Sequence, residues 1–117
     1  MRSGACTPEE LETLLEDAFV LRDRDAVMHL FDPGAVLVAG DEPTEARGAE
    51  AIARLATVMW DRDRTYLAAP RRVLQAHDTT LVVAEGVINV LRRGSDGRWR
   101  YAISLLDNDD TTERQNR

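Results

Sequence analysis

The clearest pattern of apolar and polar positions lies in the C-terminal part of the chain, residues 80–106. Two runs rich in β-branched and aliphatic residues, Thr80–Arg92 and Arg98–Leu106, flank the tetrapeptide Gly-Ser-Asp-Gly. A turn of this kind between alternating runs is typical of a β-hairpin, so we predict one long hairpin of two strands. Because both faces of this hairpin carry apolar side chains, other elements must cover at least one of them. Alternation along the first strand places on one face Leu81, Val83, Glu85, Val87, Asn89 and Leu91.

Upstream of the hairpin, apolar residues recur at the spacing of a helix. Thr7–Glu10 reads as a helix start, with Thr7 as the cap, Pro8 in the first helical position and Glu10 completing a capping box. Asp25 can cap a short second helix, Ala26–Phe31. A third helix is expected to begin near Gly48. The apolar positions of the first and third helices recur at helical spacing: Leu11, Leu14, Leu15, Ala18 and Phe19, then Ile52, Leu55, Ala56, Met59 and Trp60.

Two further strands are predicted, Ala35–Ala39 and Tyr66–Ala76, the second interrupted by Pro70. Helices and strands are largely segregated along the chain, which favours an α+β fold with three helices on one curved antiparallel sheet. We expect a disordered N-terminus over residues 1–6, one domain over 7–107 and a polar, mobile tail over 108–117. The core is predicted to contain Leu14, Phe19, Ile52, Leu55 and Met59.

Composition narrows the class of protein. The 117 residues suffice for one domain with a sizeable core. A net charge of −6 argues against nucleic acid or an anionic membrane as the main partner. All 15 basic residues are arginine, which excludes a lysine Schiff base. With no long apolar span and no signal peptide, we expect a cytoplasmic protein.

Cysteine and histidine are too sparse for a metal cluster. Cys6 is the single cysteine, so no disulfide can form within the chain. His29 and His77 lie far apart and lack the spacing of metal ligands. We therefore expect neither a bound metal nor another cofactor.

Glu85 is the sharpest candidate for chemistry. It lies within Val-Val-Ala-Glu-Gly-Val-Ile, and a carboxylate that faces an apolar pocket could act as an acid or a base. Asn89, four residues later on the same face, could bind a ligand carbonyl. The alternative is that this face is solvated, or that Glu85 pairs with arginines across the sheet.

Aromatic residues with one polar atom are candidate walls of such a pocket. Trp60, Tyr66 and Tyr101 are therefore candidate ligand-binding residues. The alternative is that they serve only core or dimer packing, where aromatic side chains are equally common.

Three phrases resemble a known family. They are Asp25–Phe31 before the first strand, Arg47–Ile52 at the start of the third helix, and Arg92–Tyr101 in the last hairpin. In this order they are similar to the nuclear transport factor 2-like superfamily, which includes ketosteroid isomerase and the SnoaL-like polyketide cyclases. The resemblance covers about residues 7–107 and implies a cone-shaped α+β fold with a pocket at its open end.

The chain departs from that family in two ways. Three strands are predicted after the third helix where the family has four, so either the sheet is shortened by one strand or Thr80–Arg92 forms two. The resemblance places the isomerase general base on Ala39 and its oxyanion-hole tyrosine on Leu15, and neither side chain can perform that chemistry. The isomerase mechanism should therefore not be transferred.

Two hypotheses about function remain. In the first, the domain binds a small, mostly apolar molecule, with or without cofactor-free acid/base catalysis by Glu85 (isomerase, cyclase or hydrolase chemistry). In the second, it is a non-catalytic module for dimerisation or protein interaction, and forms a homodimer through the outer sheet face. Large exposed apolar surfaces of that kind usually mark interfaces.

Overall fold

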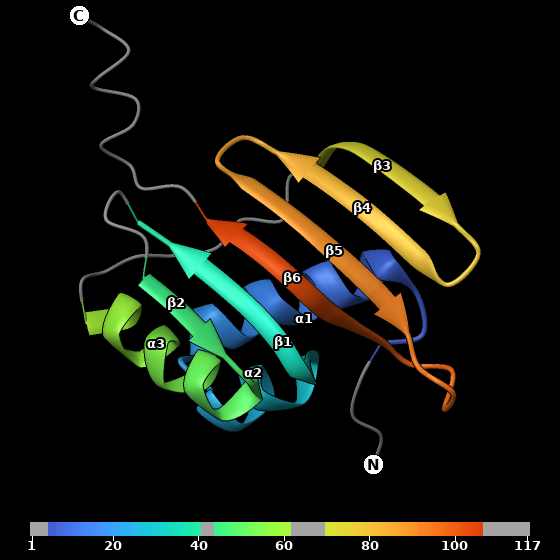
Figure 1. Ribbon diagram of the computed structural model, residues 1–117. Helices are drawn as coiled ribbons and strands as arrows, with labels where there is room; N and C mark the ends of the chain where they lie inside the picture. The colour runs from blue at the N-terminus through green and yellow to red at the C-terminus, as the bar shows by residue number, and fades with distance from the viewer. Residues whose placement is uncertain (1–4, 41–43, 62–69, 107–117) are drawn as a thin grey trace, which may run out of the picture.

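Three helices lie on one face of a single six-stranded sheet in the computed structural model (Figure 1). The structure describes residues 5–40, 44–61 and 70–106. The helices are α1 (Pro8–Leu21), α2 (Arg24–Leu30) and α3 (Ala49–Asp61). The strands are β1 (Phe31–Ala39), β2 (Thr44–Arg47), β3 (Pro70–Ala76), β4 (Thr79–Ala84), β5 (Val87–Arg93) and β6 (Trp99–Leu106).

The strands are arranged in the order β2-β1-β6-β5-β4-β3. All neighbours are antiparallel except β1 and β6, the second and third strands in this order, which run parallel. The α+β class, the three helices and the curved, mostly antiparallel sheet are confirmed, with β1 and β6 as the one parallel pair among the described strands. β2 was not predicted, because four residues with mixed polarity give little strand signal.

The predicted strand Thr80–Arg92 is two strands. The chain turns at Glu85-Gly86, where Gly86 has a φ of 76°, and β4 then pairs with β5 in a tight hairpin. Only glycine adopts such a φ without strain, so Gly86 was the sequence signal for this turn. Four strands therefore follow α3: of the two alternatives, the one in which Thr80–Arg92 forms two strands is confirmed, and the shortened sheet is wrong. The predicted turn Gly94–Gly97 is confirmed, and the amide of Gly94 donates to the carbonyl of Arg98 at 2.8 Å.

The turn at Glu85 also changes which residues face the helices. Thr80 and Val82 of β4 and Asn89 and Leu91 of β5 are buried. Leu81 was predicted to share a face with Asn89, but Asn89 lies opposite Val82 in the ladder. The predicted face is therefore wrong for β4 and correct for Asn89 and Leu91.

The start of α1 follows the predicted capping chemistry closely, whereas that of α2 does not. The amide of Glu10 donates to Thr7 Oγ1 at 3.0 Å, and Glu10 Oε1 accepts from the amide of Cys6 at 2.8 Å. In α2 the cap is Asp23 rather than Asp25, so this helix begins and ends earlier than predicted.

The N-terminal segment joins the sheet before α1 begins. Ala5 is buried and forms an antiparallel bridge with Trp99, although it was expected in a disordered terminus. The predicted tail, residues 108–117, lies outside the described residues.

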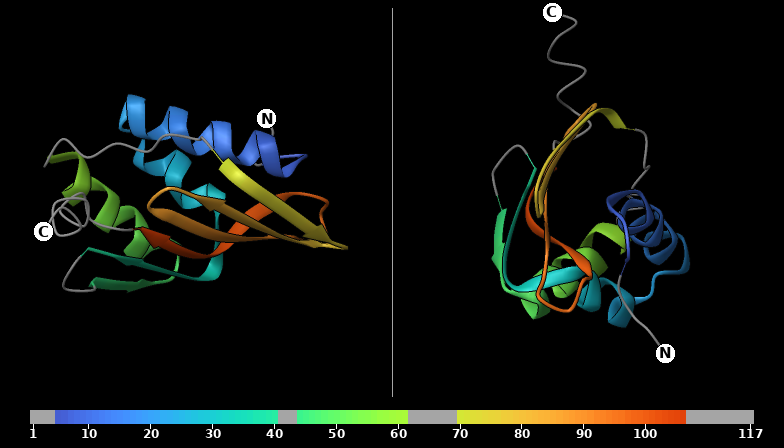
Figure 2. Two further views of the ribbon diagram at one scale, coloured as in Figure 1. Left: turned by 90° about the horizontal axis from the view of Figure 1, so that it is seen from above. Right: turned by 90° about the vertical axis from the view of Figure 1, so that its right-hand side faces the viewer.

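The core lies between the helices and the side of the sheet that curves around them (Figure 2). Phe19, Ile52 and Met59 are buried as predicted. Leu14 and Leu55 are only half-buried, because they lie at the edges of the apolar stripes of their helices. Within the described residues, no helix has the length and apolar character needed to cross a bilayer.

Candidate functional site

One row of side chains crosses the helix-facing side of the whole sheet. Its members are direct partners on neighbouring strands, in the order Val73, Val82, Asn89, Ser104, Leu37 and Ala46. All are apolar except the two central ones, Asn89 and Ser104, which are both almost fully buried. A polar pair therefore lies at the point of the row where apolar packing would be expected to be strongest.

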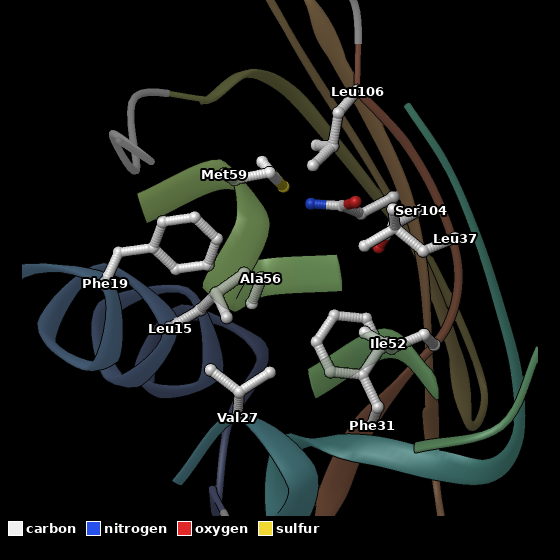
Figure 3. A pocket seen from close by; sticks show the side chains of 11 residues that line it. Leu15, Phe19, Val27, Phe31, Leu37, Ile52, Ala56, Met59, Ser104 and Leu106 are labelled. Atoms are coloured by element: carbon white, nitrogen blue, oxygen red, sulfur yellow. The ribbon is translucent and has the colours of Figure 1, made fainter. Parts of the chain in front are cut away.

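A pocket lies between this polar pair and the helices (Figure 3). It encloses about 330 Å³ when its opening to solvent is included, but it is narrow and has room for about one water molecule. Met59 and Leu106 lie at one end and Val27 and Phe31 at the other. The pocket is lined by Leu15 and Phe19 of α1, Val27 of α2, Ile52, Ala56 and Met59 of α3, and Phe31, Leu37, Asn89, Ser104 and Leu106 of the sheet.

A buried carboxylate lies behind Asn89. Glu12 is on the inward side of α1 and only 6% exposed. Its Oε2 accepts a hydrogen bond from the hydroxyl of Tyr101 at 2.8 Å and a second from Nδ2 of Asn89 at 3.3 Å. Two donors from neighbouring strands thus hold one carboxylate oxygen in place, as a buried charged group requires.

The hydroxyl of Ser104 is in a different situation. This residue is 2% exposed and lines the pocket, yet Oγ has no hydrogen-bond partner within the part of the chain that the structure describes. A buried polar group without a partner costs about 1–3 kcal/mol. Ser104 therefore destabilises the sheet unless the pocket holds something that satisfies it.

Glu85 does not lie at this site. It is in the turn between β4 and β5, its side chain is 87% exposed, and Arg71 approaches it at 3.9 Å. The argument for Glu85 as an acid or base rested on its position within an apolar strand, and that premise is wrong. Asn89, expected beside it, is the one predicted site residue within the described part of the chain that lines the pocket.

The structure places the aromatic candidates for ligand binding differently from one another. Trp60 is buried and packs edge-on against Phe19, with ring centroids 5.6 Å apart, but it is not among the described lining residues. Tyr101 is fully buried beneath the site, where it holds Glu12 and packs against Phe31. Tyr66 lies outside the described residues. Trp60 and Tyr101 thus support the pocket from behind, through residues that line it.

Sequence reasoning missed Glu12 and Ser104. Glu12 follows Leu11 and precedes Leu15 by three residues, so helical spacing alone could have placed it at the edge of the buried stripe. Ser104 was hidden by a register shift between β5 and β6, where Val90 pairs with Ile103 but Leu91 pairs with Tyr101. Ala102 is the extra residue. Before it the odd-numbered side chains of β6 face the helices, and after it the even-numbered ones do.

The turn between β5 and β6 carries a separate charged pair, away from the pocket. Hydrogen bonds from the Arg100 guanidinium and from the amide of Arg98 lower the pKa of Asp96 to about 2. Within the described residues, no group of histidine, cysteine and acidic side chains could hold a metal ion.

Comparison with known proteins identifies the fold. No protein-family model and no curated protein matches the chain. Among solved structures, it is similar to a cystatin-like domain of unknown function from Nostoc punctiforme, with a TM-score of 0.71 and 16% identity over 92% of this chain and 78% of the other. A ketosteroid isomerase-like protein from Erwinia carotovora atroseptica matches with a TM-score of 0.67 and 17% identity over 85% and 91%.

A third similar structure is a nuclear transport factor 2-like protein from Novosphingobium aromaticivorans. Its TM-score is 0.64 and its identity 18%, over 87% of this chain and 79% of the other. The predicted resemblance is thus confirmed for the fold: the chain has the cystatin-like architecture of nuclear transport factor 2-like and ketosteroid isomerase-like proteins.

Proposed function

We propose that this protein binds a small, mostly apolar molecule in the pocket between its helices and its sheet. The observation that carries the proposal is the placement of Asn89 and Ser104 in the wall of an otherwise apolar pocket. Ligand pockets commonly combine an apolar lining with a few polar groups that orient the ligand. All three helices contribute lining residues, so a ligand there would contact most of the fold.

The narrowness of the pocket means that a ligand must displace side chains. Leu106 is the one half-buried residue among the described lining residues, which favours an opening at its end, and Met59 lies at the same end (Figure 3). Methionine is unbranched and adapts readily to new shapes. Rotation of Met59 and Leu106 is therefore the expected route by which a molecule larger than water enters.

The proposal is binding rather than proton transfer. None of the described lining residues is ionisable. Leu15 lines the pocket at the position where the resemblance would place an oxyanion-hole tyrosine, and a leucine cannot donate a hydrogen bond. Glu85, the predicted acid or base, is on the surface.

Methionine-methyl NMR with toluene as the probe tests this function. Binding should shift the Met59 methyl resonance saturably and leave that of Met28 unchanged, because Met28 lies on α2 and is not among the described lining residues. Ala56→Leu fills the pocket and should abolish the shift. If Met59 does not respond up to the solubility of toluene, the proposal fails.

A second function, homodimerisation, is favoured by the outer face of the sheet. Two cross-strand rows on this face are apolar over most of their length. Ile88, Ile103 and Leu105 at their centre are between 42% and 45% exposed. Apolar surfaces of this kind usually mark interaction sites. The rows are Leu74, Leu81, Val90, Ile103 and Val36, and Val83, Ile88, Leu105 and Val38.

Charge at the ends of the second row supports another copy of this chain as the occupant. Arg72 lies beyond Val83 on β3, and Glu45 lies beyond Val38 on β2. A two-fold axis parallel to the strands would place Arg72 of each copy over Glu45 of the other. We therefore propose a symmetric dimer, the commonest assembly of soluble chains.

Light scattering tests the dimer with a matched pair of variants. Ile88→Glu should convert a dimer mass to a monomer mass, because it introduces a charge in the middle of the face. Leu21→Glu makes a similar change on α1, at a residue that is 71% exposed, and should leave the mass unchanged. A monomer mass for the unmodified protein at micromolar concentration would contradict the proposal.

A further inference from the structure

We propose that Glu12 fixes the orientation of the Asn89 amide, so that the pocket selects apolar molecules carrying a hydroxyl group over equally large molecules without one. This inference rests on the binding function proposed above and specifies the class of ligand. The residues that carry it are Glu12, Asn89, Tyr101 and Ser104.

The orientation follows from what a carboxylate can do. Glu12 Oε2 acts as the acceptor in its contacts with both Asn89 and Tyr101, and the Asn89 amide turns its Nδ2 group toward it at 3.3 Å. This turns the carbonyl oxygen of the amide away from Glu12. The Tyr101 hydroxyl donates to the same Glu12 oxygen at 2.8 Å and keeps the carboxylate from rotating away.

Ser104 completes the recognition pair. It is the direct cross-strand partner of Asn89 and lies on the same face, so the two side chains are neighbours in the pocket wall. The serine hydroxyl can donate or accept, whereas the oriented carbonyl of Asn89 can only accept. A ligand hydroxyl matches both groups, because it can donate to Asn89 Oδ1 while it accepts from Ser104 Oγ.

The carboxylate also affects the strength of this recognition. A hydrogen bond from Nδ2 to a negative oxygen polarises the amide and makes its carbonyl a better acceptor. An apolar pocket without such groups would prefer the ligand with no hydroxyl, because burying a hydroxyl without a partner is unfavourable. A preference for the hydroxyl-bearing ligand is therefore a signature of the Asn89–Ser104 pair, which the size of the pocket alone cannot produce.

Phenol and toluene form a suitable pair of probes, since they differ by a hydroxyl in place of a methyl group of similar size. Their dissociation constants are measured from the Met59 methyl shift. We expect phenol to bind about tenfold more tightly than toluene, the effect of one good hydrogen bond. If toluene binds as tightly or more tightly, the inference is overturned while the binding function stands. If neither shifts Met59, both fail.

Three variants assign the effect to residues. Glu12→Gln offers the amide a donor as well as an acceptor, so Asn89 can turn over and the preference for phenol should fall to about one. Glu9→Gln makes the same change on the exposed side of α1 and should retain the full preference. Ser104→Ala should reduce the preference without affecting Glu12, and it keeps the inference testable if Glu12→Gln does not fold. A full preference in both Glu12→Gln and Ser104→Ala would overturn the assignment.

Discussion

The two faces of β5 and β6 both depart from the usual pattern of apolar residues inside and polar residues outside, and they do so in opposite ways. On the inner face, Asn89 and Ser104 are polar and almost fully buried, whereas on the outer face their sequence neighbours Ile88 and Leu105 are apolar and more than 40% exposed. Burial normally favours the reverse arrangement. Stability of the isolated chain explains neither face, and we propose a ligand for the inner face and a second copy for the outer one.

The two faces also differ in what offsets their unfavourable free energy, which comes from buried polar groups inside and exposed apolar groups outside. Inside, Asn89 is held by Glu12, and Glu12 by Tyr101, so most of the polar cluster is satisfied by the chain itself. Outside, no contact among the described residues covers the exposed centre of the apolar rows. Substitutions that add or remove single polar groups on each face should therefore have very different effects.

The largest difference is expected from the same substitution at adjacent positions. Asn89→Asp replaces a donor by a second buried carboxylate facing Glu12, and should lower the free energy of unfolding by about 3–5 kcal/mol. Ile88→Asp places the same group on the outer face and should cost about 1 kcal/mol or less in the monomer. Urea unfolding of both variants, at a concentration where light scattering gives a monomer mass, makes the comparison. Equal losses would mean that the two faces are not distinct environments.

A smaller effect is expected from Tyr101→Phe, which keeps the ring against Phe31 and removes only the hydroxyl that donates to Glu12. Because Glu12 is buried, the loss of this donor should cost about 1–3 kcal/mol. The double variant Tyr101→Phe with Glu12→Gln should recover part of that loss, since a neutral amide needs less compensation. Simple addition of the two single losses would show that the residues act independently.

Ser104→Ala should be neutral or slightly stabilising, up to about 1 kcal/mol, although it removes a buried polar group. Its hydroxyl has no partner among the described residues, so its removal sacrifices no hydrogen bond there and relieves the cost of burial. Ser95→Ala, in the exposed turn, is the control and should change nothing. A loss above 1 kcal/mol at Ser104 would mean that the hydroxyl is satisfied in the folded protein.

Local signals in the sequence were sufficient to predict that the three helices exist and that the chain turns at Gly94–Gly97. Thr7 and Glu10 were correctly assigned to the start of α1, because capping depends on residues within one turn of helix. The overall order of elements gave the α+β class and the resemblance that the solved structures confirm for the fold.

The candidate site could be predicted from the sequence only in small part, for a physical reason. Alternation assigns faces only while a strand stays in register, and a shift of one residue inverts every later assignment. The turn at Glu85 and the extra residue Ala102 each produce such a shift, which removed Glu85 from the site and concealed Ser104. Glu12 meets partners 77 and 89 residues away, and no local pattern encodes contacts at that separation.

The smallest effect is expected from the ion pair between Asp96 and Arg100, which lies outside the buried cluster around Glu12. Arg100 and the amide of Arg98 lower the pKa of Asp96 from 3.8 to about 2 in the folded protein. A group with a lowered pKa contributes stability above its unfolded value and loses it as the pH falls. The stability difference between the unmodified protein and Asp96→Asn should therefore be constant above about pH 5 and shrink as the pH falls from about 4 to about 2. Because the Asp96 side chain is 50% exposed, added salt should also diminish the difference. Urea unfolding across this pH range measures it, and a difference that grows on acidification would show that Asp96 is not stabilised by Arg100.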